Sequence, residues 1–504
     1  MRKKLTNFIY TTHRLLGTLL SALFLVWFLS AFVMMYHSFP KLTTEKKIQK
    51  FETLMADSLS PIDSILRRVP AGEQITQITL SCPLEKAIFY IETTNNQYTI
   101  PAMNGDSLPM IDANDVLAMA KRWCASPIER IDTLYKLDQW IPFGAFKKEF
   151  PIYKFHFNDP EQHQLYIGSQ SGEPLQFTTK EARIWAWLGA IPHWVYFTWL
   201  RQDATLWSRV VIGLSALGCF MLLAGLWMGF EVWRNTRKRP GSFSPYKKKW
   251  HHWHYVTGII FGVTVLTFCF SGMMSLAEVP QWISRTELKK SPMDYLNEQP
   301  LNPEKMGDYR VLVKQIKGIK ELKWKRLGTV DFYEISMHKG RQQFRWFGGE
   351  FHPLELTRNE VLRAIQPIHS PQAKFTVTQL HQFETYYRDM SRMYKNKALL
   401  PVWKIEVDDH DQSCYYIHPK TGEVKYTNQN GRIKYWTYTA LHRLRIQGLN
   451  SSPQLRKGIL WVLLIGGTMV SLSGVVLGIR YLRRKTKKYN RRQKRRGLSS
   501  DSLN

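Results

Sequence analysis

Four long apolar stretches stand out in the pattern of hydrophobic and polar positions along the 504-residue chain. Each holds more than 20 residues without one Asp, Glu, Lys or Arg. A helix of that length, at 1.5 Å per residue, crosses a hydrocarbon core of about 30 Å. The pattern therefore predicts four membrane-spanning helices, at residues 15–36, 210–230, 251–276 and 458–479.

The polar segments between these spans differ sharply in charge. Segments 1–14, 231–250 and 480–504 hold 22 Lys and Arg against only Glu231 and Asp501, and so supply +20 of the net charge of +30. All three fall on one side of a four-span chain, and the positive-inside rule places that side in the cytoplasm. Because the basic tail adjoins a span, we interpret it as an orientation signal that contacts acidic lipid. A nucleic-acid partner is not expected.

The two remaining segments, 37–209 and 277–457, are domain-sized and are predicted to face outward as α+β domains. The strands expected from alternation and turn residues are 77–80, 87–92, 97–100, 152–157, 164–168 and 174–177, then 402–407, 414–418 and 423–426. A helix is expected near Asp112–Asp115, and another after the capping-box spacing of Thr357 and Glu360. An oxidising compartment permits a Cys82–Cys124 disulfide, which the spacing leaves open.

The chain also carries a long-period repeat. The first and third spans both begin with His-x-x-x-Gly, at His13–Gly17 and His254–Gly258, and both reach a Ser seventeen residues after the His. Further matches at offsets of 245 to 250 are Asn114 with Asn359, Ser171 with Thr421, Arg183 with Arg432, His193 with His442, Gly225 with Gly474 and Gly229 with Gly478. The chain thus reads as an internal duplication, two copies of a unit of about 250 residues, related by a pseudo-two-fold axis along the membrane normal.

Four of the fifteen histidines occupy matching span boundaries in the two copies. His13 and His254 lie at the cytoplasmic ends, and His193 and His442 lie near the outer ends. Two neutral imidazoles on opposite sides of one iron are the axial ligands of a b-type haem, and four-helix bundles build such sites from facing helices. The sequence predicts two b-type haems, one held by each pair. Histidines that only snorkel to the interface are the competing interpretation.

Other histidines compete for ligand roles. His251 and His252 lie beside His254, and His37 at the outer end of the first span breaks the repeat, so it is interpreted as a supporting or substrate-side group. The outward histidines are expected to be surface residues with at most weak metal contacts; they are His156, His163, His410 and His418. The sequence contains no flavin, nicotinamide or Walker-type motif. No catalytic residue is assigned, and electrons would have to come from membrane quinol or a cytoplasmic reductase.

Several short motifs, taken in order, resemble the PepSY-associated transmembrane protein family of bacteria. They are His13-Arg-Leu-Leu-Gly17, Val33-Met-Met-Tyr36, Pro192-His-Trp-Val-Tyr-Phe197, Trp253-His254 with Phe270-Ser-Gly272, and Leu441-His-Arg443. The resemblance covers residues 8 to 484. It implies PepSY-like periplasmic domains, an inner-membrane location and ligand roles for the same four histidines. The extra His251-His252 departs from the family pattern and leaves the ligand on the third span open.

Some members of that family are similar to ferric-siderophore reductases that hold two b-type haems in a four-helix bundle. The sequence hypothesis is therefore a four-transmembrane-helix bundle with two PepSY-like periplasmic domains, which passes electrons to a ferric siderophore or other ferric chelate. A non-enzymatic, membrane-anchored module that binds peptide or a partner protein is the alternative. A cation permease is disfavoured because the spans hold no acidic residue. The acceptor, the donor and the oligomeric state stay open.

Overall fold

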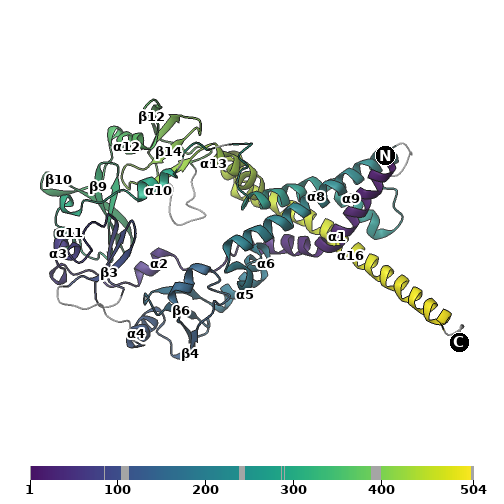
Figure 1. The fold of residues 1–504 in the computed structure, drawn as a ribbon, viewed down its shortest axis with the longest axis horizontal. Coiled ribbons are helices and arrows are strands. Elements are labelled where there is room, and N and C mark those ends of the chain that lie inside the picture. Colours follow the sequence, from purple (N-terminus) through teal and green to yellow (C-terminus); the bar gives the residue numbers. More distant parts are fainter. Residues whose placement is uncertain are drawn as a thin grey trace.

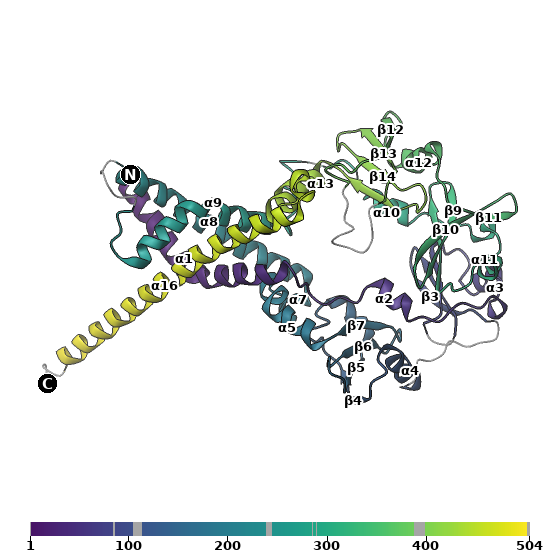
Figure 2. The same cartoon turned by 180° about the vertical axis from the view of Figure 1, so that it is seen from behind.

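Four long helices form a bundle at one end of the molecule (Figures 1 and 2). They are α1 (Arg2–Met34), α8 (Ala204–Thr236), α9 (Lys249–Met274) and α16 (Pro453–Ser500). Each is long and apolar enough to cross a membrane, so helices are present at all four predicted spans. The computed structural model describes residues 2–83, 86–103, 113–237, 244–284, 286–288, 290–387 and 399–500.

The helices extend beyond the apolar stretches into their polar flanks. Backbone hydrogen bonds within a helix can continue where the helix leaves the apolar layer and enters water. In α16 the basic residues after Ile479 continue the helix, and Figure 1 shows this end projecting beyond the bundle. Of the predicted cytoplasmic segments, residues 238–243 of the central loop and 501–504 of the tail lie outside the described residues.

Aromatic rings set against glycines hold the bundle core together. The α1 helix packs against α8 and α16, and α9 packs against the same two helices. A Cβ on Gly467 would stand 2.2 Å from the Phe28 ring, and one on Gly466 would stand 2.2 Å from the Phe261 ring. Only glycine at these two places lets the rings lie against the α16 backbone, because such close packing leaves no room for a methyl group.

The polar segments fold into three antiparallel sheets. A first lobe contains β4 (Ile128–Leu134), β5 (Ile152–Phe157), β6 (Gln164–Gly168) and β7 (Pro174–Thr178) in that order, and a second lobe contains β12 (Lys374–Leu380), β13 (Val402–Asp408), β14 (Cys414–Ile417) and β15 (Val424–Thr427) in that order. The helices α4 (Ala113–Trp123) and α12 (Arg358–Ile365) pack against these two sheets. The expected Thr357–Glu360 capping box is present. Asp112 lies outside the described residues, and α4 begins at Ala113.

The third sheet joins both polar segments. Its order is β11-β10-β9-β8-β1-β2-β3. The strands are β1 (Ile75–Ser81), β2 (Ile88–Thr93), β3 (Gln97–Pro101), β8 (Glu321–Leu327), β9 (Val330–Met337), β10 (Gly340–Phe347) and β11 (Glu350–Pro353). We call it the central sheet; it lies at the end of the molecule farthest from the bundle (Figures 1 and 2).

The join between the two segments is the pairing of β1 with β8. Leu80 lies opposite Leu322, and Ile78 lies opposite Trp324. All four side chains are buried, so the two segments share one hydrophobic core at this sheet. The sequence predicts two separate outward domains, whereas in the structure their first halves combine and only their second halves form individual lobes. The expected strands in both lobes and at β1–β3 appear within one or two residues of their predicted bounds.

Shorter elements connect these units. They are α2 (Thr44–Gln49), η1 (Ala56–Ser58), α3 (Ile62–Leu66), η2 (Gly144–Glu149), α5 (Lys180–Leu188), α6 (Ala190–Trp194), α7 (Thr198–Arg201), α10 (Pro292–Asn297), η3 (Pro303–Met306), α11 (Tyr309–Gln315), η4 (Gln366–Ile368), α13 (Gln429–Lys434), η5 (Tyr435–Ala440), α14 (Leu441–Arg443) and α15 (Gln447–Asn450). Cys82 and Cys124 are not joined by a disulfide.

Candidate functional site

The first candidate site brings together His13 of α1 and His254 of α9. Their ring centroids are 6.2 Å apart. The His13 Nδ1 atom lies 2.9 Å from the Met221 carbonyl oxygen of α8, and the His254 Nδ1 atom lies 2.9 Å from the Ser473 hydroxyl of α16. All four bundle helices therefore contribute to this pair.

The second candidate site brings together His193 of α6 and His442 of α14, again with ring centroids 6.2 Å apart. Neither residue is on a spanning helix. The short helices α6 and α14 pack against α1 and α9 respectively. Each ends in a left-handed residue, Val195 with φ 54° and Leu444 with φ 47°. This unusual conformation for branched side chains reverses the chain just after each histidine.

Serines on the spanning helices orient the second pair. The His193 Nδ1 atom lies 3.2 Å from Ser30 Oγ and 3.1 Å from the Trp27 carbonyl oxygen. The His442 Nδ1 atom lies 3.0 Å from Ser271 Oγ and 3.2 Å from the Phe268 carbonyl oxygen. Ser30 and Ser271 are the two serines that follow His13 and His254 by seventeen residues.

These contacts decide which ring nitrogen carries the proton. A carbonyl oxygen only accepts, so each Nδ1 that faces one must donate. The hydroxyls of Ser30, Ser271 and Ser473 donate their hydrogens to backbone carbonyls, so their oxygens accept from the imidazoles. All four histidines therefore carry the proton on Nδ1 and keep the Nε2 lone pair free, as a metal-binding imidazole requires.

Burial keeps the second pair uncharged. Desolvation lowers the pKa of His193 to about 4 and that of His442 to about 3, although hydrogen bonding to the Trp27 and Phe268 carbonyls opposes the shift. Both imidazoles are therefore neutral near pH 7. A neutral ring with an unoccupied Nε2 lone pair is a metal ligand.

The spacing within each pair fits a metal ion between the rings. Two imidazoles that bind one ion from opposite sides, through bonds of about 2.0–2.1 Å to one nitrogen of each ring, have ring centres about 6 Å apart. Both observed separations are 6.2 Å.

Glycines leave room around the first pair. A Cβ on Gly225 of α8 would stand 2.5 Å from the His13 ring, and one on Gly474 of α16 would stand 3.8 Å from the His254 ring. A Cβ on Gly258, one turn after His254, would meet nothing within 4 Å. The α8 backbone therefore approaches the His13 ring closely, and space is open beside Gly258.

The two pairs lie at different depths in the bundle. Along α1, the His13 position and the Trp27–Ser30 contacts of His193 are 14 to 17 residues apart, or roughly 21–26 Å. The buried side chains of Leu20 and Phe24 belong to the bundle core between these levels. The sites therefore lie toward opposite faces of the predicted membrane layer.

The other predicted ligands are not members of either pair. His37 stacks on Trp185, with ring centroids 4.2 Å apart and planes at 5°. His251 lies near Tyr246, and its buried Nδ1 has no hydrogen-bond partner in the described residues. His252 contacts the adjacent Trp253 ring. Of the three neighbouring histidines, the structure brings His254 against His13.

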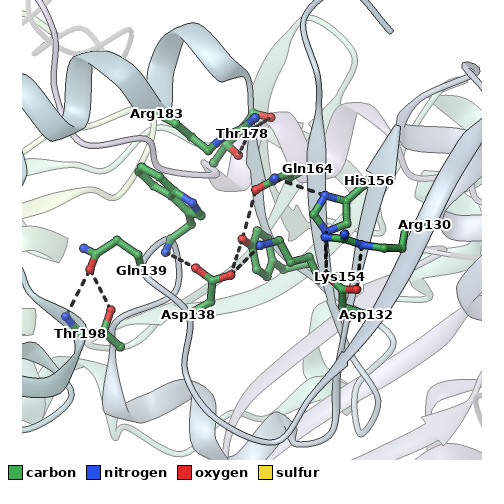
Figure 3. Close-up of polar contacts among 12 residues, drawn as sticks. Arg130, Asp132, Asp138, Gln139, Lys154, His156, Gln164, Thr178, Arg183 and Thr198 are labelled. Atoms are coloured by element: carbon green, nitrogen blue, oxygen red, sulfur yellow. Dashed lines mark hydrogen bonds and ion pairs between the residues drawn. The ribbon is translucent and has the colours of Figure 1, made fainter. Parts of the chain in front are cut away.

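A polar network ties the first lobe to the α6–α7 turn beside His193. Gln139 accepts hydrogen bonds from the backbone N–H and hydroxyl of Thr198 at 3.3 and 3.0 Å. Next to it, Asp138 pairs with Lys154 at 2.7 Å and accepts from the Tyr166 hydroxyl at 3.0 Å. Figure 3 shows the Gln139–Thr198 contacts as one group and the Asp138 contacts as a second group, which continues through Gln164 and His156 to Arg130 and Asp132.

A shallow pocket opens between the first lobe and α7. Its lining combines cationic with aromatic side chains; it comprises Tyr135, Lys136, Leu137, Lys147, Phe150, Thr198, Trp199 and Gln202. Such a lining suits a ligand that is both anionic and aromatic, because ammonium groups attract negative charge and rings stack on rings.

Sequence reasoning paired the histidines but missed most of what orients them. The sequence shows Ser30 and Ser271 as matching positions of the repeat, but it does not indicate that they hydrogen-bond to the histidines. Ser473 and the Met221 carbonyl carried no signal at all, since each lies more than 200 residues from its histidine. No family model matches the chain, and no curated protein is found to be similar to it.

Proposed function

We propose that the protein is a di-haem b electron-transfer protein that reduces a ferric chelate. The observation that carries the proposal is the geometry of the two histidine pairs. The ring centroids of each pair are 6.2 Å apart, and the Nδ1 atoms hydrogen-bond to backbone carbonyls or serine hydroxyls of the bundle helices. His13 with His254 would hold one haem and His193 with His442 the other. A haem at each place supplies reversible one-electron iron chemistry.

The chain's own residues prepare both sites. The acceptors at Nδ1 hold each ring in place and leave Nε2 as the nitrogen that would bind iron. Gly225 and Gly474 let α8 and α16 approach the rings, and the apolar core between the pairs excludes water. A dry, preformed site lowers the reorganisation that accompanies a change of charge.

The proposal includes an internal duplication. Offsets of 249 or 250 relate the left-handed Gln162 to Gln412 and Val195 to Leu444. The Asp138–Lys154–Tyr166 contacts of the first lobe reappear in the second as contacts of Glu384 with Lys404 and Tyr416.

The central sheet supports the same interpretation. Thr79 lies opposite Lys323, and their neighbours pair symmetrically about that point, Ile78 with Trp324 and Leu80 with Leu322. The residue-number offsets between partners run from 240 at Ser81–Glu321 to 246 at Ile78–Trp324, which overlaps the 241 to 250 spread of the sequence matches.

Location and family are part of the proposal. The exposed basic end of α16 and the other two basic segments favour the cytoplasmic face of a bacterial inner membrane, with the lobes and the central sheet in the periplasm. The two similar lobes, each a four-stranded meander with one helix, are consistent with PepSY-like domains. Relationship to the PepSY-associated transmembrane family rests on the motifs quoted above.

Electrons would enter at the His13–His254 site from quinol or a cytoplasmic reductase and leave from the His193–His442 site. The pocket of Tyr135, Lys136, Lys147 and Trp199 lies beside α7, close in sequence to His193, and would receive the ferric chelate. One electron converts Fe³⁺ to Fe²⁺, which hard oxygen donors bind less tightly, so the chelate would release its iron.

A visible spectrum tests this function. We expect the detergent-purified protein, expressed with ample haem, to contain two b-type haems per chain, with a dithionite-reduced spectrum typical of bis-histidine ligation. His13→Ala and His254→Ala should each remove one and the same haem, and His193→Ala and His442→Ala the other. His37→Ala and His252→Ala are the controls and should keep both haems.

A folded, colourless protein would overturn the reductase proposal and favour the alternative, a membrane-anchored module that binds peptide or a partner protein. Loss of haem in a different pairing would retain electron transfer and reject the assigned ligands. Reduction of a ferric chelate by the dithionite-reduced, desalted protein, slowed by Lys136→Glu with Lys147→Glu, tests the acceptor pocket separately.

A further inference from the structure

The first lobe contains a cluster of three different metal-binding side chains far from the histidine pairs. Cys124, Asp159 and His163 each offer one ligand atom, and these atoms all lie within 4.8 Å of one another. Cys124 directly follows α4, and the other two belong to the turn between β5 and β6. Figure 1 shows α4 at the end of this lobe remote from the bundle.

The imidazole in this cluster is held in one orientation. His163 Nδ1 lies 2.7 Å from the Asp159 Oδ2 atom, and the ring stacks on Phe177 with centroids 4.6 Å apart and planes at 8°. An ion bound at Nδ1 would therefore also meet the Asp159 carboxylate, and a hydrogen bond from the other ring nitrogen to a carboxylate is the usual support of a metal-binding histidine. The other nitrogen, Nε2, lies 3.2 Å from the Glu161 carboxylate, whose side chain is 65% exposed.

The turn itself positions the aspartate. Asp159 accepts the backbone N–H of His163 at 2.9 Å and that of Glu161 at 3.2 Å. These bonds fix its carboxylate beside the imidazole whether or not a ligand is present. Cys124, Asp159 and His163 are all partly exposed, so an ion and a water molecule have access from solvent.

The equivalent turn of the second lobe, between β13 and β14, lacks this combination of metal-binding side chains. Asp409 accepts the backbone N–H of Ser413 at 2.8 Å, as Asp159 accepts that of His163. There, both ring nitrogens of His369 contact protein groups: Nδ1 lies 3.1 Å from the Asp409 carboxylate, and Nε2 lies 2.7 Å from the Tyr415 hydroxyl. That imidazole is buried, and neither nitrogen remains for an ion.

We propose that Cys124, His163 and Asp159 form a site for a divalent cation of the zinc class, with water as the fourth ligand. A thiolate with an imidazole and a carboxylate selects a borderline ion over Mg²⁺ or Ca²⁺, which take oxygen donors only. Four ligands are the usual number for zinc. Binding displaces the Cys124 thiol proton to solvent, and no electron is transferred. The site is independent of the proposed haem function.

Zinc content measures this site directly, because haem contains none. The full-length protein in detergent is stripped with a chelator and dialysed against Zn²⁺. The wild type should then contain one more zinc ion per chain than the Cys124→Ser variant or the His163→Gln variant. Each variant should bind zinc at least about tenfold more weakly. His410→Gln, which removes an exposed imidazole beside Asp411 in the second lobe, should match the wild type.

A thiol-labelling experiment keeps the test decisive if a variant folds poorly. Zn²⁺ should slow alkylation of Cys124 in the wild-type protein by at least about tenfold, as read by peptide mass spectrometry, and should leave Cys124 labelling unchanged in His163→Gln. Equal zinc content in wild type and both folded variants would overturn the site, and so would unprotected Cys124 labelling in the zinc-treated wild type.

Discussion

The imidazoles of His193 and His442 face each other at a centroid distance of 6.2 Å from two short helices that do not themselves cross the membrane layer. Each helix is followed by a left-handed residue that turns the chain back toward the next span. The two histidines are thus attached to the lobes as well as to the bundle. A change in a lobe can therefore reach this pair without altering any spanning helix.

The first prediction concerns the glycine behind His13. Gly225→Ala places a methyl group 2.5 Å from the His13 ring and should displace it. Overpacking of this kind costs about 1–3 kcal/mol, so haem affinity at the His13–His254 site should fall about tenfold or more. Haem titration of the apoprotein, followed at the Soret band, measures the change.

The matched control for that experiment is Gly213→Ala on the same helix, where a Cβ meets nothing within 4 Å. It should leave both haem affinities unchanged. If the Gly225→Ala variant binds two haems as tightly as the Gly213→Ala variant, the close contact between Gly225 and the His13 ring has no role in cofactor binding.

The second prediction concerns the serine acceptors. Removing an acceptor from Nδ1 makes an imidazole a weaker donor to ferric iron, so the reduction potential should rise. Ser30→Ala should raise the potential of the outer haem, and Ser473→Ala that of the inner haem. Each shift should stay below about 60 mV, a tenfold change for one electron, because a backbone partner remains in place.

Redox titration of the two variants provides its own cross-control. Each substitution should move one potential and leave the other within error. A Ser30→Ala shift confined to the inner haem would contradict the assignment of Ser30 to His193.

The third prediction concerns the link between lobe and bundle. Gln139→Ala removes the acceptor of both Thr198 hydrogen bonds and leaves a partly buried backbone N–H without a partner. The expected loss of stability is about 1–3 kcal/mol, and the outer haem should be lost first on heating. Gln170→Ala, at an exposed position of the same lobe, is the control and should change neither property.

A thermal melt followed at the Soret band separates these outcomes. Simultaneous loss of both haems in Gln139→Ala, at the wild-type temperature, would show that the network does not support the α6–α7 turn.

The fourth prediction is a pH dependence in the second lobe. Burial lowers the pKa of His369, although Asp409 opposes the shift. A histidine whose pKa is lower in the folded state binds fewer protons there than when unfolded. Its contribution to stability is therefore complete above the unfolded pKa of about 6.5 and is lost as the pH falls below that value. Denaturant melts of the full chain at pH 7.5 and 5.5 should show it.

Substituting His369 tests that origin. The His369→Gln variant should have lower stability at pH 7.5 and a smaller drop between the two pH values than the wild type. The His410→Gln variant, with an exposed imidazole, should retain the wild-type pH dependence. An equal drop in His369→Gln would assign the effect to other groups.

Much of the lobe architecture was predictable, and the failures have physical causes. Strand β7 alternates between buried and half-buried positions, β5 does so in part, and β6 is buried from Leu165 to Gly168; all three are found at or near their predicted bounds. The edge strand β4 exposes both faces, so its alternation is weak and it was missed. Strand β8 does alternate, with Leu322 and Trp324 buried, and the sequence contained that signal. Its partner β1 lies more than 240 residues away, and no local pattern identifies it.

The sequence by itself determined the four spans, their charged flanks and the two matching sets of histidines. These follow from local rules, because a charge-free run of more than 20 residues must be hydrogen-bonded within itself to enter lipid. The tertiary structure decided which of His251, His252 and His254 meets His13, which ring nitrogen is free, and that the two outward segments share one sheet. It also brought Cys124 to His163. Each of these depends on side chains far apart in sequence, which only the packed chain places within bonding distance.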